Sequence, residues 1–464
     1  MAVLGFHVVI CLIAITLISK LVHRTNFIHL FITNGLYRFM APTNQELKAL
    51  LPPTKEKLNQ RNRRKKREDE AVEGFNVPKS SPFQLKLIAV DVRDLVQFEM
   101  YTSLHWLCLC IPVCLTVYSL SELYNYLMPA NRDFNVSIVF MLVIIMFVLQ
   151  VLTALSSYLV SNVDERGFML SIGAVYFLFS FIFAMNAHRV FDIQMLEAYD
   201  KLSTNIADFV EQAGVFDASM NIRDYRPTNP LMMYISLSIF FSLLSAMLVF
   251  PNFRCAIMYL KAVDIDGRVK RAIDHIGFLL PAFILAFFTK PIVHQLVNGP
   301  RKILTSDQLD IVRIYLIIFW VLSKFVTRIS HLQAHLNLSY DKVGELQNEA
   351  GKVKNYAIQA MIYRYYRYLC CASLQYFGPA ILALLFALLL KTTANLSWLG
   401  AAPGVQTAPD LSSLALTGPL RFVFDASICR AFFSFLLVVT LLINFTLQLL
   451  GVVYHSYFVG TTVN

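Results

Sequence analysis

The sequence predicts an all-α, polytopic helical membrane protein of about nine transmembrane helices, and two observations support this. Hydrophobic residues make up 57% of the 464 residues and charged residues only 15%, whereas a soluble domain carries about 25% charged residues. Long uncharged apolar runs recur along the chain, and about 20 such residues span a bilayer as a helix. Because lipid offers no hydrogen-bond partner to an open backbone, these spans must be helical.

The first apolar run covers residues 2–21 and is predicted to be a transmembrane helix, forming a first domain over residues 1–22. A signal peptide would carry positive charge before its apolar core and a small-residue cleavage site after it. Here Lys20 and Arg24 follow the run. Because basic residues stay on the cytoplasmic side, the N-terminus is expected outside.

Residues 23–100 are predicted to form a basic cytoplasmic segment that is disordered over residues 53–80, where charge is high and hydrophobicity low. Residues 21–100 hold 14 Lys and Arg against 9 Asp and Glu. In a soluble protein the stretch RNRRKKREDE (61–70) would suggest nuclear import or nucleic-acid binding. Beside a membrane span it is interpreted as a topology determinant that also attracts anionic lipid, and no nucleic-acid partner is expected. Its basic residues are Arg61, Arg63, Arg64, Lys65, Lys66 and Arg67.

Residues 101–464 are predicted to form an eight-helix membrane domain whose C-terminus lies inside. The count would be ten instead of nine if the segment at 25–40 re-entered the membrane or if the outer helix inserted into it. Pro281 and Pro379 fall inside two of the spans, where membrane helices tolerate them. The expected spans cover residues 101–122, 137–159, 167–186, 230–250, 276–294, 308–326, 366–390 and 430–458.

The two longest connections have different characters. The loop at 187–229 holds seven acidic and four basic residues and is expected outside, with an amphipathic helix that caps the headgroups. The sequons at Asn135 and Asn395 also fall outside, so glycosylation is predicted there. The segment at 327–362 is expected inside as a helix with an apolar seam, for which packing on its own bundle is favoured over a partner coiled coil.

A set of polar residues within the spans forms a candidate polar seam. Such residues line a wet path in some membrane proteins, but interhelical hydrogen bonds are the commoner role, and packing is favoured over a pathway here. Arg313 is expected to reach outward or to pair with Asp310 on its own helix face. The seam comprises Arg313, Thr440, Asn444, Gln448 and His455.

Catalytic and metal-binding chemistry has no support in the sequence. No carboxylate lies at the centre of a predicted span, and no acidic ring or selectivity-filter motif is present, although ion-coupled transporters and cation channels commonly use them. His331 and His335 have a zinc-like spacing, but no third ligand is evident, so they are interpreted as surface or packing residues. We therefore expect no enzyme activity, no metal and no cofactor.

Several longer segments carry a family resemblance that runs nearly end to end. They include FPNFRCAIMYLKAV (250–263), ISHLQAHLNL (329–338), YLCCASLQYFGPA (368–380) and LLLKTTANLSW (388–398). With them, the chain resembles the transmembrane protein 161 family of animal multi-pass proteins. The resemblance implies a link to membrane excitability and cardiac rhythm through restraint of potassium and calcium currents. One branch of the family implies a link to oxidative stress and DNA damage, and the resemblance implies no catalytic residues.

Three functional hypotheses follow. The first is a non-enzymatic protein of the plasma membrane, or alternatively of an endomembrane, that modulates ion currents by binding ion-channel proteins. The second is an ion channel or transporter with a neutral polar path lined by Asn444, Gln448 and Arg313. The third is a membrane scaffold in the stress response. The sequence leaves the oligomeric state open.

Overall fold

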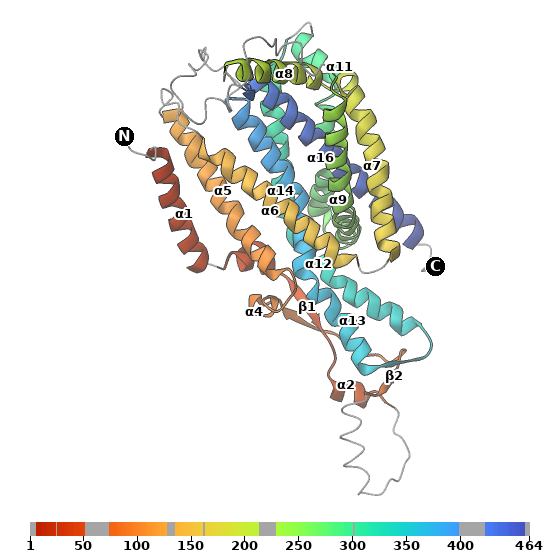
Figure 1. Ribbon diagram of the computed structural model, residues 1–464. Coiled ribbons are helices and arrows are strands. Elements are labelled where there is room, and N and C mark those ends of the chain that lie inside the picture. The colour runs from red at the N-terminus through yellow and green to blue at the C-terminus, as the bar shows by residue number, and fades with distance from the viewer. Residues whose placement is uncertain are drawn as a thin grey trace, which may run out of the picture.

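The computed structural model describes residues 6–24, 26–51, 74–127, 135–160, 163–212, 229–299, 302–398 and 423–459. Within these ranges, nine long helices form a bundle. A smaller module extends from one end of it (Figure 1). The bundle helices are α1 (Phe6–Arg24), α5 (Tyr101–Leu127), α6 (Val136–Leu159), α7 (Val163–Val190), α9 (Leu231–Ile265), α10 (Arg268–Ala286), α12 (Ser306–Asn348), α14 (Leu369–Thr393) and α16 (Ala426–Tyr454).

Every predicted span overlaps a helix, but the span 308–326 covers less than half of α12, and the span 276–294 runs past the end of α10. The helices also differ in how apolar they are. Six helices among the described residues are long and apolar enough to cross a membrane: α5, α6, α7, α9, α14 continued from α13, and α16. In α1 the apolar stretch is shorter, Val8–Leu21. The starts of α10 and α12 carry charged residues such as Asp274, Asp310 and Arg313. The count of nine crossings, and the side on which each terminus lies, therefore stay predictions.

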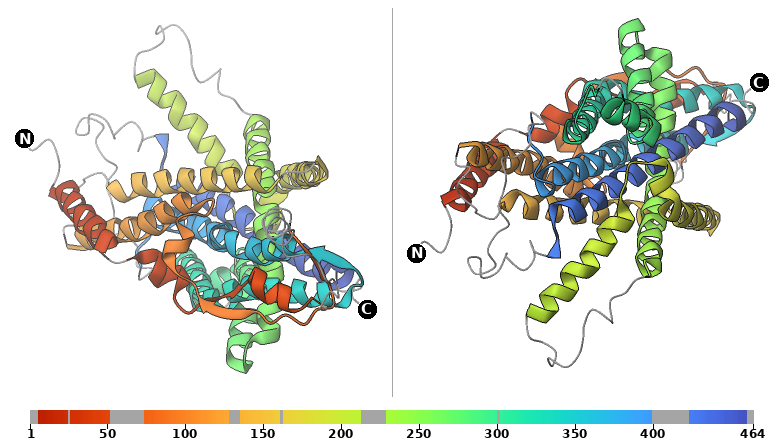
Figure 2. Two further views of the ribbon diagram at one scale, coloured as in Figure 1. Left: turned by 90° about the horizontal axis from the view of Figure 1, so that it is seen from below. Right: turned by 90° about the horizontal axis from the view of Figure 1, so that it is seen from above.

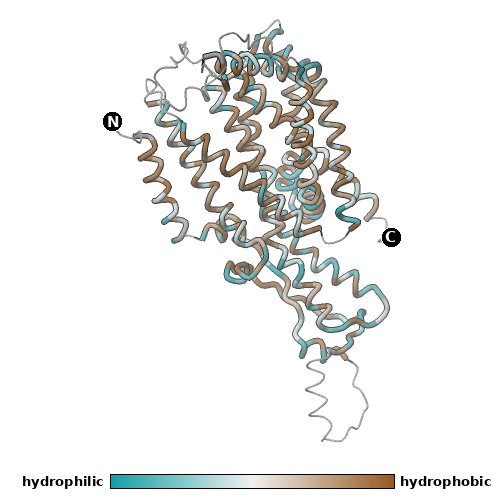
Figure 3. Tube along the Cα trace, viewed as in Figure 1, coloured by the Kyte–Doolittle hydropathy of each residue, from teal (hydrophilic) through white to brown (hydrophobic). Residues whose placement is uncertain are grey.

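The centre of the bundle is α14, which is buried along almost its whole length. Helices α5, α6, α9, α12 and α16 pack around it, and the views along the bundle axis show it enclosed (Figure 2). Apolar residues dominate the bundle, whereas the ends and the smaller module are more polar (Figure 3). A helix that is hydrophobic on all sides belongs in the interior.

A proline inside a helix leaves a backbone carbonyl without its usual partner, because proline has no N–H to donate four residues back. Pro251, Pro281 and Pro379 free three such carbonyls. In each case a neighbouring helix supplies a donor. Ser156 Oγ donates to the carbonyl of Met247, which Pro251 leaves free, at 3.2 Å. Trp320 Nε1 donates to Gly277 O, which Pro281 leaves free, at 3.1 Å, and Cys255 Sγ donates to Gln375 O below Pro379 at 3.7 Å.

The Trp320 bond provides a direct test of this arrangement. We expect Trp320→Phe to lower the free energy of unfolding by about 1–3 kcal/mol, because the buried Gly277 carbonyl loses its donor. Trp106 is half exposed, so Trp106→Phe should change stability by less than about 0.5 kcal/mol. Unfolding of both variants in detergent micelles measures the difference, and equal stabilities would contradict the role given to Trp320.

The smaller module, here called the sheet module, combines two segments that are distant in sequence. It contains α2 (Asn44–Ala49), α4 (Val92–Leu95), α13 (Asn355–Arg367) and the end of α12. Strand β1 (Tyr37–Met40) pairs antiparallel with β3 (Lys86–Ala89), and β2 (Asn76–Pro78) pairs antiparallel with β4 (Lys352–Lys354). Its core consists of Leu47, Val77, Phe83, Val343, Ile358 and Ile362.

The sheet module corrects two expectations. Residues 74–80 are ordered, not disordered, because Val77 is fully buried and its strand pairs with β4. The segment at 23–100 also contains short strands that the all-α prediction missed. Packing of the 327–362 segment on its own chain is confirmed, since Leu332, Leu336 and Val343 are buried. The basic run 61–67 lies outside the described residues.

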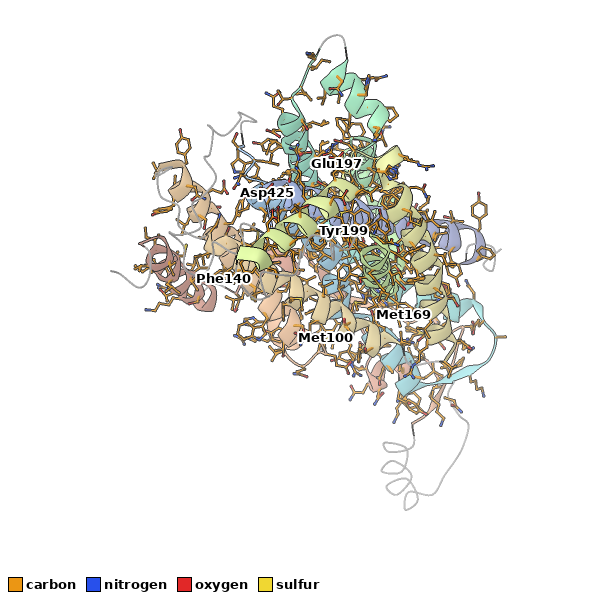
Figure 4. The ribbon with its side chains drawn as sticks, turned by 45° about the horizontal axis from the view of Figure 1, so that its top comes forward. Met100, Phe140, Met169, Glu197, Tyr199 and Asp425 are labelled. Atoms are coloured by element: carbon orange, nitrogen blue, oxygen red, sulfur yellow. The ribbon has the colours of Figure 1, made fainter. Side chains whose placement is uncertain are left out.

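At the opposite end of the bundle, α8 (Met195–Gln212) lies across the helix ends (Figures 2 and 4). The predicted amphipathic helix is therefore present. Met195, Ala198 and Ala207 are buried against the rest of the chain, whereas Leu196 and Ile206 are exposed. Contact of this helix with lipid headgroups stays a prediction. Lys201 Nζ donates to Ser427 Oγ at 3.3 Å, which joins α8 to the start of α16 beside Asp425. Short helical turns complete the described chain: η1 (His29–Thr33), α11 (Lys290–Val293), η3 (His294–Asn298) and η5 (His455–Val459).

Candidate functional site

Helices α9 and α16 cross closely at Gly451. A Cβ atom built on Gly451 would lie 2.8 Å from Ala256 Cβ and 3.2 Å from Phe253 Cα. Small residues at such a crossing let two membrane helices approach closely and bring their polar side chains into contact. The candidate site lies along this crossing.

Three buried amides connect the two helices. Asn252 Nδ2 donates to Asn444 Oδ1 at 3.2 Å, and Gln448 Nε2 donates to Asn252 Oδ1 at 3.1 Å. Asn252 and Asn444 are fully buried and Gln448 nearly so. Asn444 Nδ2 has no hydrogen-bond partner among the described residues. Asn444 and Gln448 therefore bond to a common partner, Asn252, which our sequence analysis missed.

A cluster of ionisable side chains lies next to this seam. Lys324, His331 and Asp274 are all more than nine-tenths buried, and with Gln448 they line a cavity of about 10 Å³, which is about the space of one water molecule. Tyr376 Oη donates to Lys324 O at 3.0 Å and shares a hydrogen bond of 3.0 Å with Thr327 Oγ1. Burial of ionisable side chains is costly, so this cluster is a candidate site.

The two histidines of the inner segment are buried, so the surface interpretation is wrong and the packing interpretation holds. His331 Nδ1 bonds to Thr327 O at 3.0 Å, and His335 Nε2 to Tyr365 O at 3.1 Å. Burial lowers the pKa of each to about 3, with a smaller contribution from Lys324 or Arg254, respectively. No group of three potential metal ligands exists among the described residues.

Arg313 belongs to a different site at the α8 end of the bundle. Its guanidinium donates to Asp310 Oδ1 at 2.5 Å and to Phe287 O at 2.9 Å, and it lies 3.3 Å from Asp192 Oδ2. The predicted pairing with Asp310 is confirmed. Phe287 lies ten residues after Gly277 along the α10 direction, so Arg313 is about 15 Å from the cavity. The structure therefore does not join Arg313 to Asn444 and Gln448.

The remaining predicted residues occupy separate places. Thr440 Oγ1 donates to Leu436 O of its own helix at 2.7 Å, and His455 contacts the rings of Phe253 and Tyr454 at the end of α16. Asn395 is exposed directly after α14. Asn135 caps α6, where its Oδ1 accepts from Ser137 N at 3.1 Å. Glycosylation of either asparagine stays a prediction.

The sheet module contributes to a surface groove of about 520 Å³ between β1, β3, the end of α9 and α12. Tyr340 is more than half exposed there and stacks on Phe39 with ring centroids 5.5 Å apart. Lys261 and Asp341 form an ion pair of 2.8 Å in the groove. Sequence reasoning missed it, because its lining residues come from four separate segments.

The fold and its sites can now be compared with known proteins. A family model described as predicted transmembrane protein 161AB matches residues 2–459. The chain belongs to this family. The resemblance carried by segments such as residues 250–263 and 368–380 is therefore confirmed, and this member of the transmembrane protein 161AB family is a multi-pass helical membrane protein. No solved structure matched it.

Proposed function

We propose that this member of the transmembrane protein 161AB family is a non-enzymatic membrane protein that restrains potassium and calcium currents by binding channel proteins, at the plasma membrane. The observation that carries the proposal is the closed polar seam. Asn252, Asn444 and Gln448 bond to one another, and the adjacent cavity of about 10 Å³ has space for about one water molecule. A seam closed in this way favours a packing role over conduction.

The groove of the sheet module supports binding of a partner. It combines exposed aromatic side chains with the Lys261–Asp341 ion pair, a mixture common at protein interfaces. We expect Tyr340→Ala to reduce the restraint of a co-expressed channel current. Tyr356 is similarly exposed on α13 but does not line the groove, so Tyr356→Ala is the matched control.

The experiment has two arms. The purified protein is first placed in a planar bilayer, where silence from a folded sample is expected and a specific current altered by Asn444→Leu would overturn the proposal. Channel currents are then recorded in cells with wild type, Tyr340→Ala or Tyr356→Ala at equal surface expression. Equal restraint by all three would remove the groove from the mechanism, and no restraint by wild type would favour the stress-linked scaffold.

A second candidate function, a conductor or transporter, is favoured by one specific observation. Lys324, Asp274 and His331 are buried beside Gln448, and ionisable residues inside a membrane bundle often mark ion pathways. The path would then include these residues and exclude Arg313, unlike the neutral path expected from the sequence. The bilayer recording described above distinguishes the two functions.

A further inference from the structure

Two carboxyl groups face each other where the chain turns from α9 into α10. Asp266 follows the last residue of α9, and Asp274 lies on the second turn of α10. The Asp266 carboxyl group lies within hydrogen-bonding reach of the Asp274 carboxyl group. Both oxygens of Asp274, together with Oδ2 of Asp266, are shielded from solvent and have no donor among the described residues.

This arrangement needs a proton. An ionised carboxylate is only an acceptor, so two of them cannot bond to each other, whereas a protonated one donates to its neighbour. Two carboxylates that share a site commonly hold one proton between them, because the like charges repel. Asp274 is 3% exposed, so water does not relieve the repulsion at its oxygens.

Among the described residues, no neighbouring side chain supplies a hydrogen bond to the Asp274 carboxyl group in place of that proton. His331 Nδ1 lies 3.8 Å from Asp274 Oδ1, but this nitrogen already bonds to Thr327 O and the ring stays neutral. Lys324 of α12 and Lys270 of α10 favour the charged form of Asp274, yet neither forms an ion pair with it within 4 Å among the described residues. Tyr259 of α9 and Tyr376 of α14 also interact electrostatically with Asp274. Arg271 of α10 donates to the backbone carbonyl of Asp266 at 3.2 Å.

We propose that Asp266 and Asp274 form a proton-binding site, which holds one proton taken from the aqueous phase at that end of the bundle and ties the α9–α10 turn to α10. Asp274 precedes the predicted span 276–294, so the site is at the membrane boundary. Burial first, and then Asp266, raise the pKa of Asp274 to about 7. This inference is independent of the proposed action on ion currents.

The sign of the pH dependence follows from the raised pKa. A carboxyl group with a higher pKa in the folded protein binds its proton more tightly there, so its contribution is present at low pH and is lost as pH rises through the folded pKa. The thermal midpoint of the wild-type protein in lipid nanodiscs should therefore fall by a few degrees between about pH 6 and pH 8.5.

Substitutions isolate the pair from other titrating groups. Asp274→Asn supplies a permanent donor to Asp266, and Asp266→Asn supplies one to Asp274, so each variant should lose most of this fall and melt at a higher temperature than wild type at about pH 8.5. Asp264 is exposed in the last turn of α9, so Asp264→Asn should retain the wild-type fall. If both Asp274→Asn and Asp266→Asn retained it, the proposal would be wrong.

Infrared spectroscopy gives a readout that does not depend on stability. A protonated carboxyl group has its own carbonyl stretching band, which should be present in the wild-type protein below the pKa and absent from Asp274→Asn. Absence of the band from folded wild type would overturn the proposal. So would stabilisation of wild type, but not of Asp274→Asn, by Ca²⁺ or Mg²⁺ at about pH 8.5, since the pair would then be a cation site.

Discussion

Arg313→Leu is expected to lower the free energy of unfolding by about 3–5 kcal/mol, the usual effect of removing one partner from a buried ion pair. Arg313 is 2% exposed and contacts Asp310, Asp192 and the Phe287 carbonyl. Leucine would leave the buried Asp310 carboxylate with Arg430 as its remaining charged partner and the Phe287 carbonyl without these donors. Denaturant unfolding in detergent micelles, together with the yield of folded protein, measures the effect.

Two further variants sharpen this prediction. Arg313→Lys keeps the charge but not the planar fork that reaches several acceptors, so an intermediate loss is expected. Arg166 is exposed, and Arg166→Leu should change stability by less than about 0.5 kcal/mol. If a folded Arg313→Leu protein were as stable as Arg166→Leu, the ion-pair network of Arg313 would not stabilise the bundle. If ion flux through that folded protein were altered, Arg313 would again be a candidate pathway residue.

Gly451→Leu is expected to produce the second large loss of stability. A Cβ atom at Gly451 would approach Ala256 Cβ to 2.8 Å and Phe253 Cα to 3.2 Å, distances at which α9 and α16 must separate. Overpacking of a tight core costs about 1–3 kcal/mol and sometimes more. Separation would also break the Asn252–Asn444 and Asn252–Gln448 bonds. Thermal unfolding in nanodiscs is the appropriate measurement.

The chain offers a matched control and a rescue for this prediction. A Cβ atom at Gly344 on α12 meets nothing within 4 Å, so Gly344→Leu should be neutral or slightly stabilising, since leucine favours helix over glycine. The milder Gly451→Ala should be partly rescued by Ala256→Gly, which removes the nearer clash. If Gly451→Leu were no worse than Gly344→Leu, close approach of the two helices would not be required.

Much of the fold could be predicted from local sequence. Each of the nine predicted apolar spans overlaps one of the long helices among the described residues, and several agree to within a few residues. This is expected because a helix that spans a membrane requires a long run of apolar residues. The amphipathic period also placed α8. Strands β2 and β4 were missed because each is only three residues long. Each forms a strand only through hydrogen bonds to its partner, which lies almost 280 residues away.

The candidate site was predicted only in part. Helical spacing placed Asn444 and Gln448 on one face of α16, and the structure agrees. That spacing could not reveal Asn252, since its partner is 192 residues away. Our sequence analysis also grouped Arg313 with the seam, because the sequence does not show at which depth along the bundle axis a polar residue of one helix lies relative to those of another helix. Asp274 was not predicted as a site residue, because it lies just before the predicted span 276–294 and only carboxylates at the centre of a span were considered.

By itself, the sequence determined the chemical class of this protein. Hydropathy is a property of each segment alone, so it establishes a helical membrane bundle with polar connections. The tertiary structure decided which polar groups meet. Trp320 donates to the Gly277 carbonyl that Pro281 leaves free. Arg313 pairs with Asp192 at the α8 end of the bundle, and Asp274 lies beside Asp266. These pairings depend on how neighbouring helices are rotated and how deep they sit, and packing of the whole bundle sets both.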